Sequence, residues 1–368
     1  MAFVRYLKSE KLFLALLLLL ALFLFFNPHD FMPMWGFVEW NTIESLTGLL
    51  IISTAIKESA LFNRISLRMI KHFRTERVLG IFLVTLSAVF SMFLTNDITL
   101  FIVVPLTLNL QKFLKNDVSK MVIFEALAVN VGSMLSPIGN PQNLFLWHIW
   151  EISFFKFISL LFLLEIITFG ILVMLTFCTF KRKHLVLEKE GLSYKIDTKL
   201  AIISVIFLAL YVLFIQFKTE KFAVVPIFLF YLLFNKDILK KVDWFLLMIF
   251  ILMFLDIQFL TQINLIGMLI ENMGPFTPER TFLFSLISSQ LMSNVPAAIF
   301  MSKFSSSYLA ITYGVNIGGN GIVIGSLANI IALRMSKKKG AYLTFHKYSL
   351  PFFAITALVG YYMIGLFT

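Results

Sequence analysis

The sequence has few charged residues and almost no cysteine. Only 14% of its 368 residues are Asp, Glu, Lys or Arg, whereas 59% are hydrophobic. This balance excludes a soluble globular protein, because such a chain cannot form a sufficiently polar surface, and it predicts a polytopic membrane protein. The one cysteine, Cys178, excludes an internal disulfide and gives no cluster of thiolates for a metal site.

Sequence motifs of enzymes are lacking as well. The chain has no phosphate-binding glycine-rich loop with lysine, no cluster with metal-ligand spacing and no arrangement typical of a catalytic triad. Its net charge of +11 comes from basic residues in short segments between apolar runs, which indicates membrane topology rather than a nucleic-acid partner. We therefore expect no enzyme, no cofactor, no structural metal and no nucleic acid as partner.

Apolar runs long enough to cross a lipid bilayer are abundant. The first, residues 12–26, follows Arg5, Lys8 and Lys11 as a signal peptide would, but no small-residue cleavage site follows it. We interpret it as a retained membrane span. In residues 61–77 a basic residue recurs every three or four positions, which predicts either a helix on the membrane surface or an ordinary cytoplasmic loop.

Two matching stretches organise the chain. Residues 130–143 read NVGSMLSPIGNPQN, residues 316–329 read NIGGNGIVIGSLAN, and the two align without a gap. Gly, Pro and Asn are unfavourable inside an apolar helix, so each stretch is predicted to interrupt a membrane-spanning helix. Paired interruptions of this kind are typical of transporters built from two repeats.

A second pair of matching stretches precedes the first pair. These are SMFLTND at residues 91–97 and SQLMSNV at residues 289–295, each between two apolar arms. Each predicts a re-entrant helical hairpin, whose polar tip is tolerated inside the membrane only where protein or water surrounds it. The predicted fold is an all-α polytopic membrane protein with two inverted-topology repeats, each containing a re-entrant hairpin and a broken transmembrane helix.

The repeats divide the chain into three parts. The first repeat is residues 1–180, with its hairpin at 78–114 and its broken helix at 121–150. A basic loop and a linker span occupy residues 181–220. The second, inverted repeat is residues 221–368, with its hairpin at 280–305 and its broken helix at 312–334.

The distribution of Lys and Arg predicts the orientation in the membrane. Basic residues gather in five segments that are predicted to be internal: 57–77, 112–120, 181–199, 236–241 and 334–347. This places the N-terminus in the cytoplasm and the C-terminus outside, with nine crossings if both hairpins are re-entrant. The unpaired span at 200–217 inverts the second repeat, so the two hairpin tips meet near the middle of the membrane.

The helix ends inside the membrane form the predicted binding site. Helix N-termini offer N–H groups to an anion, and C-terminal carbonyls suit Na⁺, so the hairpin tips are candidate Na⁺ sites. No Arg lies inside a predicted span, which leaves helix dipoles, amides and bound cations to hold an anion. The predicted substrate- and ion-binding residues are Thr95, Asn96, Asp97, Asn130, Ser136, Gly139, Asn140, Asn143, Ser293, Asn294, Asn316, Gly318, Gly319, Gly325, Ser326 and Asn329.

Some of these residues have a second interpretation. Glycines in a membrane helix also permit tight helix packing. Asp97, whose counterpart is Val295, is predicted either to carry a proton or a cation or to cap the start of a helix. Glu125 and Asp256 are the other predicted proton-relay residues. His148 and His346 lie beside span ends, where we expect structural side chains that reach toward the membrane surface.

At the tips and breaks the sequence resembles the ion transporter superfamily, which includes arsenite-efflux permeases, citrate and dicarboxylate–sodium symporters and one class of sodium–proton antiporters. In the dicarboxylate symporters both tips carry Ser-Asn-Thr; here they read Thr95-Asn96-Asp97 and Ser293-Asn294-Val295. The first tip and the run Ile138-Gly139-Asn140-Pro141-Gln142-Asn143 are more similar to arsenite-permease-like anion permeases. The similarity covers nearly the whole chain from Val38.

The resemblance implies that each tip, with its broken helix, holds the coupling cation and one edge of the substrate, while a hairpin-bearing domain slides against a dimeric scaffold. We expect a secondary active transporter of a small inorganic or organic anion in the cytoplasmic membrane, coupled to H⁺ or Na⁺, that works as a homodimer by elevator-type alternating access. The alternative is a sodium–proton antiporter in which Asp97 carries the exchanged charge. A membrane-embedded enzyme and a passive channel are further alternatives.

Overall fold

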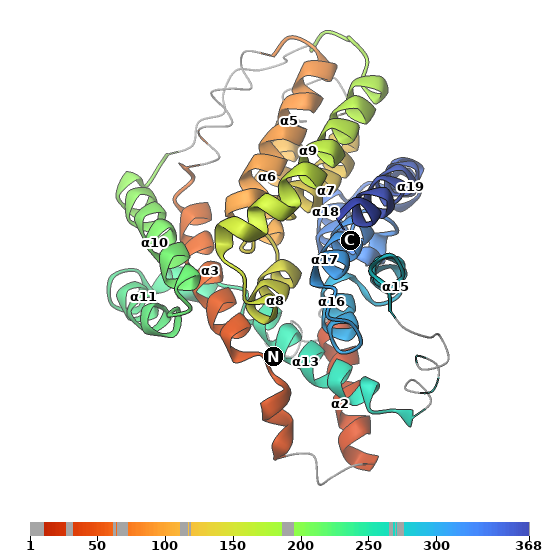
Figure 1. The fold of residues 1–368 in the computed structure, drawn as a ribbon. Helices are drawn as coiled ribbons and strands as arrows, with labels where there is room; N and C mark the ends of the chain where they lie inside the picture. The colour runs from red at the N-terminus through yellow and green to blue at the C-terminus, as the bar shows by residue number, and fades with distance from the viewer. Residues whose placement is uncertain are drawn as a thin grey trace.

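The protein is almost entirely helical in the part that the computed structural model describes, which is residues 11–26, 32–61, 64, 73–110, 117, 119–185, 195–264, 268, 270 and 276–367 (Figure 1). Within these residues there is no β-strand beyond one isolated bridge between Thr75 and His184. Five of the helices are long and apolar enough to cross a membrane. The predicted all-α polytopic class is therefore confirmed, whereas the nine crossings stay a prediction.

The first half of the chain contains two interrupted pairs of helices. Residues 94–95 separate α5 from α6, and residues 134–140 separate α7 from α8. Asn140 caps α8 by accepting a hydrogen bond from the Asn143 N–H, and Pro141 stands at the first helical position, as expected for a residue without an N–H. The helices are α2 (Lys11–Phe26), α3 (Trp40–Glu58), α5 (Glu76–Phe93), α6 (Asn96–Leu110), α7 (Ser119–Ser133), α8 (Pro141–Trp150) and α9 (Phe154–Thr179), with the short 3₁₀-helix η2 (Pro33–Phe37).

The second half repeats this order of elements. Ser293 alone separates α15 from α16, and residues 319–326, which include the 3₁₀-helix η3 (Val323–Gly325), separate α17 from α18. The span α10 has no counterpart in the first half. The helices are α10 (Thr198–Gln216), α11 (Lys221–Phe234), α12 (Lys236–Lys241), α13 (Trp244–Thr261), α15 (Pro278–Met292), α16 (Asn294–Ser302), α17 (Tyr308–Gly318), α18 (Leu327–Ser336) and α19 (Ala341–Phe367).

Both breaks are shorter than the sequence predicted. The first half of the broken helix was expected to end at Val129, but α7 continues to Ser133, so Asn130 lies inside it. Asn316 likewise lies inside α17. Asparagine does not interrupt these helices because the side-chain amides of Asn130 and Asn316 find partners in the other repeat; Asn316 donates in addition to the Thr312 carbonyl one turn earlier in α17. The predicted surface helix at residues 61–77 lies largely outside the described residues.

The segments that the sequence assigns to the internal side contact one another. The Asp197 N–H donates to the Ser59 carbonyl over 3.1 Å, and the Glu76 N–H donates to the Lys183 carbonyl over 2.9 Å. Lys241 forms an ion pair with Glu58. The structure thus groups these segments at one end, while the prediction that this end faces the cytoplasm rests on charge alone.

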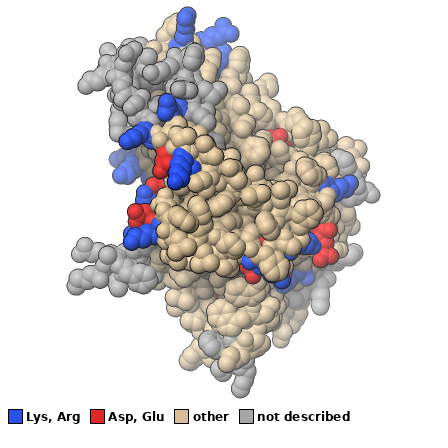
Figure 2. All heavy atoms as spheres, turned by 90° about the vertical axis from the view of Figure 1, so that its left-hand side faces the viewer, with Lys and Arg blue, Asp and Glu red and all other residues tan. Residues whose placement is uncertain are grey.

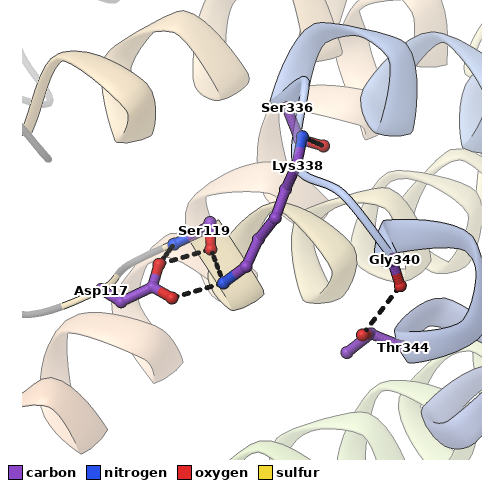
Figure 3. A network of polar contacts seen from close by, with 6 residues as sticks. All are labelled: Asp117, Ser119, Ser336, Lys338, Gly340 and Thr344. Carbon is purple, nitrogen blue, oxygen red and sulfur yellow. Dashed lines mark hydrogen bonds and ion pairs between the residues drawn. The ribbon is translucent and has the colours of Figure 1, made fainter.

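A polar cluster joins two more of these segments (Figure 3). Lys338, after α18, forms an ion pair with Asp117 and a hydrogen bond with Ser119 at the start of α7. Burial acts to raise the pKa of the Asp117 carboxyl, but the hydrogen bonds from Lys338 and Ser119 outweigh it and lower the pKa to about 2. The cluster ties the loop after the first hairpin to the end of the second broken helix.

The loops that do not belong to the basic segments also contact each other. Lys218 lies 3.5 Å from Glu151, and the hydroxyls of Thr281 and Ser305 are 2.8 Å apart. These contacts link the end of α8 with the turn after α10, and the start of α15 with the end of the second hairpin.

The broken helices form the centre of the molecule. All the side chains from Met121 to Ser133 in α7, and from Pro141 to His148 in α8, are buried. In Figure 1 α10 and α11 lie to one side of the centre and α15 and α19 to the other. Figure 2, which looks onto the α10–α11 side, shows a wide area without charged side chains. The interrupted backbone is therefore enclosed by protein, and the apolar surface lies outside.

Candidate functional site

Asparagine side chains join the two broken helices. Asn130 in α7 donates through Nδ2 to Asn329 Oδ1 over 2.9 Å, and Asn316 in α17 donates to Asn143 Oδ1 over 2.6 Å. Positions 130 and 316 correspond in the aligned stretches, and so do positions 143 and 329. The two hydrogen bonds are therefore the same contact made twice, once from each repeat.

Two further pairs of contacts are also made by equivalent positions of the two repeats. Asn140 donates to Asn316 Oδ1 over 3.0 Å, and its counterpart Ser326 donates to Asn130 Oδ1 over 3.1 Å. Asn143 also donates to the backbone carbonyl of residue 133, and Asn329 donates to the corresponding carbonyl of Gly319. The repeat that is visible in the sequence is therefore a repeat of hydrogen bonds in the fold.

Each hairpin lies against the break of a helix. The Asn96 N–H at the first tip donates to the Gly139 carbonyl over 2.9 Å, and Ser136 donates to the Met92 carbonyl over 2.6 Å. The second helix of each hairpin also crosses to the other repeat, since α6 packs on α18 and α16 packs on α8. Both tips therefore border the asparagine network.

The tip residues keep hydrogen-bonding capacity. The Thr95 hydroxyl and Asp97 Oδ1 are buried and have no partner among the described residues. Asp97 lies in the first turn of α6, and the Asn96 side chain, not that of Asp97, accepts the Asp97 N–H. Asn96 and Asn294 donate no side-chain hydrogen bond to any described residue. Neutral donors and one carboxyl group thus remain unused at the tips.

The second tip has a distinct backbone. Ser293 adopts φ 74° and ψ 159°, which side-chain-bearing residues rarely adopt. Its hydroxyl lies 3.4 Å from Asn294 Oδ1. The next residues form the N-terminus of α16, with Pro296 in its first turn, and Gly319 at the start of the second break lies beside the Asn294 side chain.

Several glycines of the two matching stretches are in tight contact with protein. A Cβ at Gly132 would lie 2.1 Å from the Ala88 carbonyl oxygen, one at Gly139 would lie 2.3 Å from that of Ser133, and one at Gly318 would lie 2.6 Å from the Ser289 Cβ. Gly132 and Gly318 thus permit close packing of neighbouring helices, which is the second of the two interpretations, whereas Gly139 lets the chain of the first break pass close to the end of α7. The Gly325 carbonyl, near the end of the second break, accepts a hydrogen bond from Ser289 over 3.4 Å.

Gln290 is a site residue that sequence reasoning missed. Its Nε2 donates to the Gly318 carbonyl over 2.7 Å, and its Oε1 accepts from the Ile322 N–H over 2.8 Å. It therefore satisfies the carbonyl just before the second break and an N–H in the middle of that break. The sequence offered one signal for it: Gln290 is a polar residue within the stretch SQLMSNV, at the position where the first repeat has the apolar Met92.

A cavity of about 590 Å³ reaches the second tip. It lies between α2 and α13 on one side and α6, α16 and α18 on the other, and its polar lining is Asp243, Asp256, Ser293 and Arg334. Both carboxylate oxygens of Asp256 are buried without a partner among the described residues. Asp243 caps α13, and its charge acts on Asp97. The cavity therefore connects a hairpin tip with acidic side chains.

Glu125, the third predicted relay residue, lies apart from this cavity. It is fully buried between α6 and α7, where the Thr107 hydroxyl donates to Oε1, and Oε2 has no partner among the described residues. Among those residues, no group of three or more His, Cys, Asp or Glu is placed to hold a metal ion. The arrangement is suited to binding a small ion through neutral dipoles and single carboxyl groups.

The comparison with known proteins identifies the family. Residues 9–308 match the family model described as CitMHS, citrate transporter. The chain is 35% identical over 365 residues to the inner membrane protein YbiR of Escherichia coli, covering 98% of this chain and 97% of that protein. It is 36% identical over 329 residues, 88% of each chain, to the uncharacterized transporter MJ0456 of Methanocaldococcus jannaschii. The chain belongs to the citrate transporter family of membrane transporters, within the ion transporter superfamily that its tips and breaks resemble.

Proposed function

We propose that the protein is a secondary active transporter that moves a small anion or oxyanion across the cytoplasmic membrane, coupled to H⁺ or Na⁺. The observation that supports this proposal is one hydrogen-bonded network that joins the two broken helices, with a hairpin tip against each break and a cavity that reaches Ser293. Backbone groups freed at such breaks need partners in a membrane, and a transported solute provides them.

The substrate site of this proposal lies at the two tips. The N-terminal turns of α6 and α16 present N–H groups to an anion, and the side chains of Asn96, Asn294, Thr95 and Ser293 add uncharged groups. A coupling cation would bind where Asp97 or Asp256 offers an unpartnered oxygen. The asparagines of the network act on the solute indirectly, by holding the two breaks together.

In this proposal the protein transports its solute by an elevator-type movement, in which one part of the protein slides against another. The two repeats, residues 1–180 and 221–368, supply the hairpins and broken helices of one moving unit, which slides against α2, α3, α10, α11 and α13. The cavity between α13 and α18 would be the passage to one side. A homodimer and a cytoplasmic N-terminus complete the proposal, on the grounds of the resemblance and of the basic segments.

A screen of ligands followed by an uptake assay tests this function. Purified protein would be heated with arsenite, antimonite, citrate, succinate, sulfate, Na⁺ or Li⁺, because a ligand that binds the folded state raises its melting temperature. The solute that does so should then enter proteoliposomes with saturable kinetics that collapse with the H⁺ or Na⁺ gradient. Folded Asn96→Ala and Asn294→Ala variants should lose about tenfold of this uptake, roughly the contribution of one buried hydrogen bond. Wild-type rates in both variants would refute the site.

The second candidate function is sodium–proton antiport, which the unpartnered oxygen of Asp97 and its proximity to the Asp243 charge favour. Vesicles loaded with a pH-sensitive dye distinguish the two functions. An antiporter acidifies or alkalinises the lumen when Na⁺ alone is added, whereas an H⁺-coupled symporter does so only when the solute is present and a Na⁺-coupled symporter gives no pH signal with Na⁺ alone. Asp97→Asn should abolish the Na⁺-driven signal if antiport is the function.

A further inference from the structure

A second group of buried polar side chains lies outside the candidate site, where α8, α3 and the turn between α10 and α11 meet. His148 Nε2 is 3.1 Å from Ser45 Oγ and 3.8 Å from Glu220 Oε1. The side chains of His148 and Glu220 are each 3% exposed. His148 was expected to reach toward the membrane surface, and this expectation is wrong, because Ser45 and Glu220 hold it inside the protein.

Burial forces this pair to hold a proton. Glu220 Oε2 has no hydrogen-bond partner among the described residues, so an ionised Glu220 beside a neutral His148 would be a buried charge that only the charge of Lys218 and a hydrogen bond with Ser45 offset. One bound proton removes this conflict. On the imidazole it gives an ion pair, and on the carboxyl group it leaves both side chains neutral. The two side chains therefore titrate as one unit. Burial also raises the pKa of the Glu220 carboxyl.

The surrounding charges act on the pair in opposite directions. Glu44 on α3 adds negative charge near Glu220 and favours the protonated pair, whereas Lys218 in the turn before α11 opposes protonation. Lys218 is itself 3.5 Å from Glu151 at the end of α8. Tyr211 on α10 donates its hydroxyl to the Glu44 carbonyl over 2.8 Å and remains neutral. No other charged group acts on the pair from the described residues.

The pair connects two bodies of the structure. His148 lies on α8, the second half of a broken helix, whose first turn carries Asn143 of the asparagine network. Ser45 and Glu220 belong to α3 and to the turn before α11, and α3 packs on α10 and α11. When the pair holds a proton, the contact between His148 and Glu220 therefore connects the broken helix to α3 and to the turn between α10 and α11.

We propose that His148 and Glu220, with Ser45, form a proton-binding site that fastens α8 to α3 and the α10–α11 turn when protonated and releases it when deprotonated. The idea that release permits movement rests on the proposed function, since α8 is part of the moving unit there. The proton site itself does not depend on transport. With the proposed orientation it lies toward the external side, where the external pH would set its occupancy.

Hydrogen exchange measured by mass spectrometry tests the site without any substrate. Wild-type protein in lipid nanodiscs should show amide exchange in α8 that, after correction for the intrinsic pH effect, accelerates at least about tenfold between about pH 6 and about pH 9. His148→Gln and Glu220→Gln should each abolish this acceleration. Glu151→Gln is the matched control, because it removes an exposed carboxylate from the same end of α8; by freeing the charge of Lys218 it should shift the acceleration to lower pH without removing it.

Each outcome decides the proposal. A wild-type α8 whose corrected exchange is independent of pH overturns it, even if the variants fail to fold. An acceleration that persists in folded Glu220→Gln or His148→Gln protein overturns it as well, and so does its loss in Glu151→Gln. If the acceleration follows the proposal but uptake by the same variants keeps its wild-type pH dependence, the proton site stands and the proposed movement of α8 is wrong.

Discussion

Asn316 donates a hydrogen bond to Asn143 over 2.6 Å, and the counterparts of these residues, Asn130 and Asn329, repeat the bond over 2.9 Å. Each bond crosses from one repeat to the other. Each broken helix therefore satisfies only part of the hydrogen bonding of its asparagines, and the other half of the chain supplies the rest at the centre of the molecule.

We expect Asn143→Ala to be strongly destabilising. Its amide accepts from Asn316 and donates to the backbone carbonyls of residues 133, 134 and 136. Because a buried polar group left unpaired costs about 1–3 kcal/mol, the loss should reach about 2–4 kcal/mol of unfolding free energy. Reversible unfolding in detergent micelles measures it. Asn41→Ala, at an exposed position of α3, is the control and should change stability by less than about 0.5 kcal/mol; equal losses would contradict the role of the network.

Gly132→Ala should separate α5 from α7. The new Cβ would lie 2.1 Å from the Ala88 carbonyl oxygen, so the helices must move apart, at a cost of about 1–3 kcal/mol or more. Gly170→Ala in α9 is the matched control, because its Cβ would meet nothing within 4 Å. There the better helix propensity of alanine should stabilise the protein by up to about 1 kcal/mol. Melting temperatures of the two variants should therefore move in opposite directions.

Asp256→Asn should leave the protein folded and change its ion dependence. Both carboxylate oxygens are buried in the cavity lining without a described partner, so a neutral amide should not reduce stability. If Asp256 binds the coupling ion, the rise in melting temperature with Na⁺, or the response of uptake to a pH gradient, should disappear. Glu165→Gln removes a buried carboxyl group outside the cavity and should keep the wild-type response. Identical ion dependence in Asp256→Asn and wild type would exclude Asp256 from coupling.

The Asp117–Lys338 contact should stabilise the protein in a pH-dependent way. The pKa of Asp117 is lowered to about 2, below its unfolded value of about 3.9, so the contribution is complete above about pH 4 and is lost as the pH falls through about 2. The contact is largely exposed, so it should contribute no more than about 1 kcal/mol. A double-mutant cycle with Asp117→Asn and Lys338→Gln measures the coupling. Coupling that is equal at neutral pH and near pH 2 would contradict this assignment.

The sequence was sufficient to predict where the backbone is interrupted. Gly, Pro and Asn at matching positions are costly in an apolar helix, and the structure interrupts the α-helix at residues 134–140 and 319–326. The sequence was not sufficient to place Asn130 and Asn316, which lie inside helices. Their conformation depends on partners almost two hundred residues away, and local propensity does not contain that information.

Two other residues escaped prediction for the same reason. Gln290 satisfies the backbone of the second break, and His148 is buried against Glu220, but both stand in ordinary helical positions in the sequence. A polar residue near a span end looks like an interfacial side chain unless the element that buries it is known. Glu220 lies in a turn about seventy residues later in the chain. A glutamate in a turn is itself expected to be exposed to solvent, so the sequence gives no sign that it buries His148.

The two tips are equal in their sequence pattern but unequal in their backbone. Ser293 has φ 74°, whereas Thr95 is not among the described residues with positive φ. A serine in that conformation costs about 1–3 kcal/mol, so the second tip carries a conformational tension that the first does not. The two matching tips thus differ in backbone strain, and in the proposed transport a solute that lets Ser293 change conformation would release free energy only at the tip that borders the cavity.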